Sequence, residues 1–108
     1  MSFFEVAKTS DIPEGAMKAV SIQGKEIVVV NYSGNYYAIN RRCTHMGGDL
    51  SKGKLDGKIV TCPRHGSRFD VTTGVSIAGP KIGFIKLKTK NEPGYQVKVV
   101  NGSISVDI

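Results

Sequence analysis

Two short clusters contain every cysteine and histidine of the chain. Cys43 and His45 form a Cys-x-His pair, Cys62 and His65 form a Cys-x-x-His pair, and the 108 residues include no other Cys or His. Two thiolates and two imidazoles are a complete four-donor set for a transition metal. We therefore expect these four residues to assemble one metal centre.

The order of the donors bears on which metal they bind. A structural zinc site of two Cys and two His usually has a Cys-x-x-Cys pair followed by a His pair. Here each cluster combines one thiolate with one imidazole, so two loops can place both thiolates on one metal and both imidazoles on a neighbouring metal, which suits a two-iron centre. A zinc-stabilised nucleic-acid-binding module stays open as an alternative. The net charge of +6 favours it, although no helix pattern suited to a DNA groove is present.

The remainder of the chain has the apolar pattern of strands, and it contains no amphipathic helix pattern of useful length. Ile85 begins an alternation with lysines that predicts a half-buried antiparallel strand over residues 85–90. Asn101-Gly102 separates two alternating segments and is typical of a tight hairpin turn. The predicted strands cover residues 19–22, 25–32, 36–39, 85–90, 95–99 and 104–108. The sequence therefore predicts an all-β fold.

Glycines interrupt the strand pattern between residues 41 and 83, and both metal-binding clusters lie within this segment. Glycine permits the close backbone approaches that wrapping a chain around an inorganic centre requires. We expect a single domain, 1–108, in which residues 1–40 and 84–108 form a strand-built base. Residues 41–83 form a loop-rich cluster-binding subdomain on that base.

The sequences CTHMGGDL at residues 43–50 and CPRHGSRFD at residues 62–70 closely resemble the two cluster loops of Rieske [2Fe–2S] proteins. The resemblance implies one [2Fe–2S] cluster, with Cys43 and Cys62 on the inner iron and His45 and His65 on the outer iron. It also implies a Rieske fold of stacked antiparallel sheets with a small cluster-binding subdomain.

Two positions separate this chain from the respiratory members of that family. Those proteins carry an additional cysteine in each loop, joined as a disulfide, whereas Gly48 and Arg64 occupy the corresponding positions here. The chain is therefore more similar to the soluble ferredoxins of multicomponent oxygenases. This similarity implies a one-electron carrier, not an enzyme, that passes electrons from a flavin-dependent reductase to a terminal oxygenase or similar acceptor. A small redox or sensor subunit of a larger oxidoreductase is the alternative.

The resemblance also implies roles for residues around the cluster. Ser67 corresponds to a serine that donates a hydrogen bond to a cluster sulfur, while Phe69 replaces a tyrosine that would donate a second one. Met46 could shield the cluster, although ordinary local packing is the more common role of such a residue. Pro80 lies in the segment Ala78-Gly79-Pro80, which resembles a third loop of the family that closes over the cluster.

Charge and hydropathy give expectations about partners and location. Four arginines next to the ligands are candidates for docking a partner with an acidic surface: Arg41, Arg42, Arg64 and Arg68. The longest apolar run, residues 27–30, is far too short for a membrane helix, and no secretory leader is recognisable. With both cysteines assigned to metal, we expect a cytoplasmic protein that binds neither membrane nor nucleic acid.

Overall fold

The computed structural model describes residues 2–42, 48–64, 66–78, 81–82, 85–86 and 91–108. The elements in this part of the chain are β-strands and two short 3-10 helices, in agreement with the predicted all-β class. The strands are β1 (Phe3–Lys8), β2 (Met17–Ile22), β3 (Lys25–Tyr32), β4 (Asn35–Asn40), β5 (Lys54–Asp56), β6 (Ile59–Thr61), β7 (Arg68–Asp70), β8 (Ser76–Ala78), β9 (Lys81–Ile82), β10 (Ile85–Lys86), β11 (Gly94–Tyr95), β12 (Val97–Val100) and β13 (Ser103–Asp107), and the 3-10 helices are η1 (Thr9–Asp11) and η2 (Leu50–Lys52).

The central sheet has the order β11-β4-β3-β2 and is antiparallel throughout. Its strand β3 contains the apolar run from Ile27 to Val30, and all four of these side chains are fully buried. A strand that is apolar at consecutive positions must be covered on both faces. The central sheet therefore requires one layer above it and one below.

The first covering layer is the sheet β1-β13-β12. Ile104 and Val106 of β13 pack in one core with Ile27 and Val29 of β3, and each buried side chain of this size contributes about 1.5–3 kcal/mol. The predicted hairpin at Asn101-Gly102 is confirmed, because β12 and β13 pair across it and its two residues have φ angles of 49° and 78°. Both angles lie in the left-handed region that this kind of turn requires.

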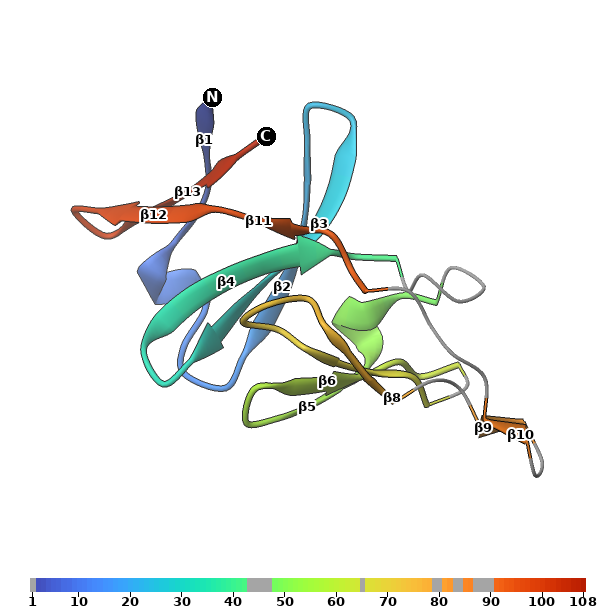
Figure 1. The fold of residues 1–108 in the computed structure, drawn as a ribbon. Coiled ribbons are helices and arrows are strands. Elements are labelled where there is room, and N and C mark those ends of the chain that lie inside the picture. The colour runs from blue at the N-terminus through green and yellow to red at the C-terminus, as the bar shows by residue number, and fades with distance from the viewer. Residues whose placement is uncertain (1, 43–47, 65, 79–80, 83–84, 87–90) are drawn as a thin grey trace.

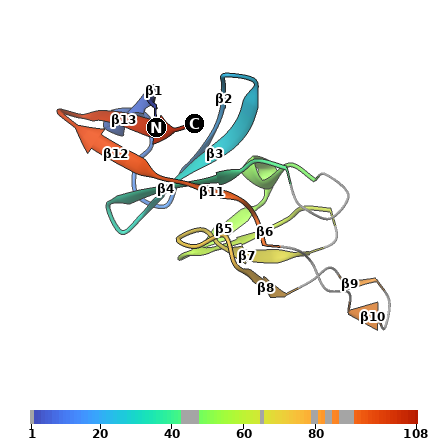
Figure 2. The same cartoon turned by 45° about the horizontal axis from the view of Figure 1, so that its top comes forward.

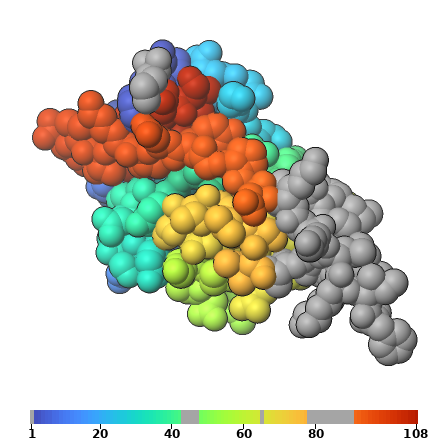
Figure 3. Space-filling view, in the orientation of Figure 1, coloured from blue at the N-terminus to red at the C-terminus, as the bar shows by residue number. Residues whose placement is uncertain are grey.

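The second covering layer is the antiparallel sheet β5-β6-β7-β8, which carries the second metal-binding cluster. Val60 of β6 and Phe69 of β7 pack against Val28 and Val30 on the opposite face of β3. The three layers are visible in Figure 1 and in the rotated view of Figure 2. In the space-filling view, β12 lies at the upper left in red-orange, and the sheet β5-β6-β7-β8 lies toward the bottom in lime and yellow (Figure 3).

The structure differs from the expected strands at several places. Strands β1 and β5 to β8 lie in segments where no strand is expected. The strand expected over residues 95–99 is divided, because β11 pairs with β4 whereas β12 pairs with β13. The chain passes from one sheet to the other at Gln96, whose carbonyl accepts from the Asp107 N–H at 2.9 Å. Of the strand expected over residues 85–90, the structure describes only β10, and residues 87–90 lie outside the described part.

The described strands divide among the layers in a simple way. Residues 3–40 and 94–107 build the first two sheets, and residues 54–78 build the third. Strands β9 and β10 pair with each other and form a ribbon beyond the third sheet (Figures 1 and 2). The exact subdomain boundaries at residues 41 and 83 stay a prediction. None of the described residues belongs to a helix long and apolar enough to cross a membrane.

Candidate metal centre

The second ligand cluster lies in the turn between β6 and β7. Cys62 follows β6 directly, and its side chain is buried in the same core as Phe69 and Leu50. The Cys62 N–H donates to the Ser67 carbonyl at 2.7 Å, and the Gly66 N–H donates to the Cys62 carbonyl at 3.2 Å. These two bonds close the loop at its base, so the Cys62 thiol has a fixed position at the inner wall of the site.

The first ligand cluster lies between the end of β4 and η2. Arg42 and Asp49 form an isolated antiparallel bridge, and the Leu50 N–H donates to the Arg41 carbonyl at 2.8 Å. The residues that flank the first ligand cluster in the sequence therefore lie side by side. Cys43, His45, Met46, His65 and Pro80 lie outside the described residues, and their roles stay predictions.

Gly48 shows that the two loops come together. A Cβ atom at this buried residue would lie 2.5 Å from the Cys62 Sγ and 3.4 Å from the Arg64 Cβ, and the first of these distances is shorter than any real contact. The last residue of the first loop thus lies directly against the second loop. The residue that follows the first donor segment is thus brought against Cys62 of the second segment, as a metal centre shared by the two segments requires.

Ser67 has a buried hydroxyl group that no described residue hydrogen-bonds. Its side chain is 1% exposed, and its Oγ finds no hydrogen-bond partner among the described residues. Buried hydroxyls are nearly always hydrogen-bonded, because an unsatisfied one costs about 1–3 kcal/mol. Together with the buried Cys62 thiol and the absence of a side chain at Gly48, this hydroxyl fits a bound group with acceptor sulfurs, as a [2Fe–2S] cluster has.

Phe69 and Arg64 are both described. Phe69 is fully buried and packs in the core beside Cys62, where its ring offers no hydrogen bond. Arg64 is exposed, and its Cβ faces Gly48 across the two loops. Gly48 and Arg64 occupy the two positions of the cross-link of the respiratory proteins and carry no thiol, so that cross-link cannot form here.

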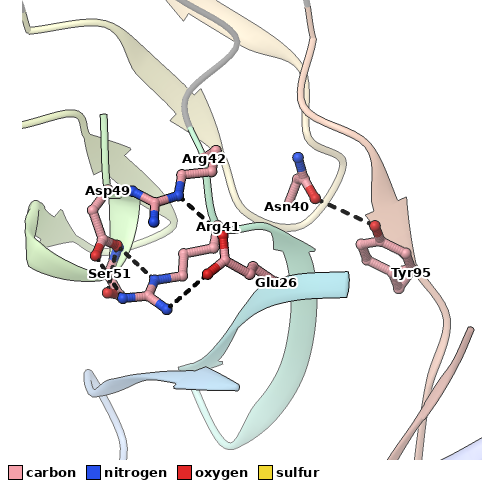
Figure 4. Close-up of polar contacts among 7 residues, drawn as sticks. All are labelled: Glu26, Asn40, Arg41, Arg42, Asp49, Ser51 and Tyr95. Carbon is pink, nitrogen blue, oxygen red and sulfur yellow. Dashed lines mark hydrogen bonds and ion pairs between the residues drawn. The ribbon is translucent and has the colours of Figure 1, made fainter. Parts of the chain in front are cut away.

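A network of charged residues surrounds the first loop (Figure 4). The Arg41 guanidinium donates from Nε to Asp49 Oδ1 at 3.1 Å and from Nη2 to Asp49 Oδ2 at 2.8 Å. Asp49 also caps η2, accepting from the Ser51 N–H at 3.0 Å and the Ser51 Oγ at 2.6 Å. The bond from Arg41 is the main reason that the pKa of Asp49 lies far below its usual range.

Glu26 extends this network to the central sheet. Its Oε2 accepts from the Arg42 Nε at 3.1 Å, and its Oε1 lies 3.7 Å from the Arg41 Nη1. On the other side of β4, the Tyr95 hydroxyl donates to the Asn40 Oδ1 at 3.3 Å. Burial, and then the charge of Glu92, raise the pKa of Tyr95. The end of β4 is thus held on both sides just before the ligand loop begins.

The sequence predicts Arg41 as one of the docking residues, and it does not mark Glu26 or Asp49 as part of the site. The four arginines differ in their exposure to solvent and in their partners. Arg41 is directed inward to Asp49, Arg42 is half-exposed beside Glu26, and Arg64 and Arg68 are exposed. Opposite charges at the two ends of the first ligand loop were the signal that could have revealed the pair.

The stacked β-sheets, the buried Cys62 thiol against Gly48 and the buried Ser67 hydroxyl fit a small metal-binding protein of the iron–sulfur class. A family model described as the Rieske [2Fe-2S] domain matches residues 2–89. The chain belongs to this family, which confirms the resemblance drawn from its two motifs and favours an iron–sulfur cluster of Rieske type over zinc.

Several similar proteins are ferredoxins. The ferredoxin component of the naphthalene 1,2-dioxygenase system of Pseudomonas putida is 34% identical over 108 residues, which cover 100% of this chain and 97% of the relative. A chain in the complex of reduced oxygenase and oxidized ferredoxin of carbazole 1,9a-dioxygenase matches with a TM-score of 0.85 and 30% identity, over 96% of this chain and 100% of that chain. The ferredoxin of carbazole 1,9a-dioxygenase from Nocardioides aromaticivorans IC177 matches with a TM-score of 0.81 and 28% identity, over 98% of this chain and 97% of that chain.

Proposed function

We propose that the chain is a one-electron carrier that holds a single Rieske [2Fe–2S] cluster and passes electrons from a flavin-dependent reductase to a terminal oxygenase. In this proposal Cys43 and Cys62 bind the inner iron, and His45 and His65 bind the outer iron. The chain is a ferredoxin component and not a catalytic subunit. The observation that carries the proposal is that a named ferredoxin component aligns with 100% of this chain.

The protein's own groups support the cluster assignment. Cys62 supplies a buried thiol, Gly48 lets the backbone approach it closely, and the Ser67 hydroxyl has no hydrogen-bond partner among the described residues. When bound, a cluster of this type supplies one-electron chemistry at a potential that its two histidine ligands raise above that of an all-cysteine cluster. The burial of Cys62, Ser67 and Phe69 excludes water from the inner side of the site.

Charge is distributed unevenly along the chain, which bears on the partners. Residues 41–90 contain eleven of the fifteen Lys and Arg but only three of the nine Asp and Glu, so this segment has a net charge of +8 and the remaining residues have −2. Among its described cations, Lys52, Lys54 and Arg68 are exposed. A charge distribution that is positive at one end of the molecule orients a charged partner during encounter. We infer that the electron partners present acidic surfaces to the cluster-bearing end.

Small electron acceptors of opposite charge test both parts of the proposal without any partner protein. The reduced protein should donate one electron per chain, and it should reduce ferricyanide, an anion, faster than a cationic cobalt(III) complex of similar driving force. Added salt should slow the reduction of ferricyanide and accelerate the reduction of the cobalt complex. At an ionic strength of about 0.1–0.15 M, charges that lie more than about 8–10 Å apart are largely screened from each other.

Two variants locate the charged surface. Arg68→Gln removes an exposed cation next to the second ligand loop, and Lys98→Gln removes one in β12 of the base. The first variant should slow ferricyanide reduction and the second should not. Equal effects of the two variants would contradict a basic docking end, and a protein that accepts no electron would contradict the carrier function itself.

Purification from the native source tests the partners and location. Within the proposal the protein is cytoplasmic and binds its reductase and oxygenase transiently. Stable co-purification with one large subunit would instead indicate a small redox subunit of a larger oxidoreductase.

A further inference from the structure

The first ligand loop is closed by side chains as well as by backbone. Its two ends are Arg42 and Asp49, which form an antiparallel bridge. Arg41, immediately before this bridge, makes two parallel hydrogen bonds to the Asp49 carboxylate at 3.1 and 2.8 Å. A fork of this kind fixes distance and orientation together, unlike a single contact between point charges.

The Arg41–Asp49 pair is shielded from water. The Arg41 side chain is 22% exposed and that of Asp49 is 12% exposed, whereas the ion pairs Lys8–Glu5, Lys18–Asp11, Arg42–Glu26 and Lys58–Asp70 each include a side chain that is at least 42% exposed. Exposed ion pairs contribute little, and partial burial strengthens a pair that keeps its hydrogen bonds. This pair is therefore the one best suited to hold the loop.

Asp49 and Glu26 connect the pair to rigid parts of the fold. Asp49 also accepts two bonds from Ser51, which fixes its carboxylate at the start of η2. Glu26 contacts both Arg41 and Arg42 from β3, and its carbonyl accepts from the Arg41 N–H at 3.1 Å. Figure 4 shows these side chains converging between β3, the end of β4 and η2. The loop is thus tied to the central sheet and not only to itself.

We propose that Arg41 is a positioning residue for the cluster, and that its paired hydrogen bonds to Asp49 hold the first ligand loop in register with the second. The proposal relies on the ligand assignment given above, in which this loop supplies one thiolate and one imidazole. If the Arg41–Asp49 pair at the base of this loop is lost, the two ligands that the loop supplies are held less firmly. Removal of the pair then affects how firmly and in what geometry the cluster is bound, beyond any general loss of stability.

The test compares Arg41→Gln, Asp49→Asn and the double variant with Lys58→Gln, all as cluster-loaded proteins. Lys58→Gln is the matched control, since it breaks an ion pair to Asp70 at 3.4 Å within the cluster-bearing sheet and crosses no loop base. The first measurement is the rate at which the visible absorption bleaches in an iron chelator. The second is the EPR spectrum of the reduced protein, whose line positions report ligand geometry and do not follow global stability.

We expect each single variant to lose its cluster roughly 5- to 30-fold faster than the wild type, the range that a perturbation of this size produces. The EPR lines should shift or broaden in both, and the double variant should be no worse than either single variant, because the two side chains act as one unit. Lys58→Gln should behave as the wild type.

Equal bleaching rates and identical EPR spectra in Arg41→Gln and Lys58→Gln would overturn the positioning role. Should Arg41→Gln not fold, Arg41→Lys decides: lysine keeps the charge but cannot form the fork, so an intermediate bleaching rate is expected, and a wild-type rate overturns the proposal. A wild-type protein that binds no cluster would be a different result, since it would refute the proposed function itself.

Discussion

Replacing Ser67 by alanine should lower the reduction potential of the cluster. The Ser67 Oγ is buried and has no partner among the described residues, so it is free to donate to a cluster sulfur. Such a bond is stronger when the acceptor is more negative, and reduction adds one negative charge. The hydroxyl therefore stabilises the reduced state more than the oxidised state.

The size of this effect follows from hydrogen-bond energies. A bond to a neutral acceptor contributes about 0.5–1.5 kcal/mol and one to a charged acceptor about 1.5–3 kcal/mol, so the difference between redox states is about 1–1.5 kcal/mol. For one electron, about 59 mV corresponds to a tenfold change in the equilibrium constant, or about 1.4 kcal/mol. The Ser67→Ala potential should then lie roughly 40–65 mV below that of the wild type.

Protein-film voltammetry or a dye-mediated titration followed by EPR measures the difference. Thr72→Val is the matched control, because its hydroxyl bonds to Asp70 Oδ1 at 2.6 Å within the same part of the chain. That variant loses a hydroxyl without changing the surroundings of the cluster, and its potential should not move. An unchanged potential in Ser67→Ala, or an equal shift in Thr72→Val, would refute the hydrogen bond to the cluster.

Three further predictions concern His65, Gly48 and Tyr95. His65→Cys exchanges a neutral ligand for an anionic one and should lower the potential by on the order of 100 mV or more, and an unchanged potential in voltammetry would show that His65 does not bind iron. Gly48→Ala places a Cβ 2.5 Å from the Cys62 Sγ and should reduce the iron content of the purified protein. Gly94→Ala is the control and should keep its iron, because its Cβ would meet only the Ala38 carbonyl oxygen at 3.9 Å. Equal iron content in the two variants would contradict the close approach of Gly48 to Cys62. Because burial and Glu92 raise the pKa of Tyr95, the unfolded state loses this phenolic proton first, so the stabilisation is intact below about pH 10 and is lost as the pH rises through the folded-state pKa. Denaturant unfolding should show a steeper alkaline loss of stability for the wild type than for Tyr95→Phe, and parallel curves would exclude the effect.

Sequence patterns were sufficient for the strands β2, β3, β4 and β13 and for the metal-binding motifs, but not for β1. The continuous apolar run of β3 and the Asn101-Gly102 turn carry local signals, and both are confirmed. The donor clusters identified the family because their residue types and spacing are chemically restrictive.

Other features depend on contacts that no local pattern contains. Strands β5 to β8 have three residues each, too few for alternation to be recognised. They exist because Val60 and Phe69 are covered by Val28 and Val30 of β3. The Arg41–Asp49 pair likewise exists only when the chain returns past the first ligand loop, so a count of arginines near the ligands could not show which of them is directed inward.

Metal and sulfide analysis of the purified protein, combined with EPR after reduction, tests the central claim most directly. The account predicts a brown protein that contains iron and acid-labile sulfide in equal amounts. Its reduced form should give a signal with an average g value below that of the free electron. A colourless protein that contains one zinc ion per chain and no sulfide would contradict it.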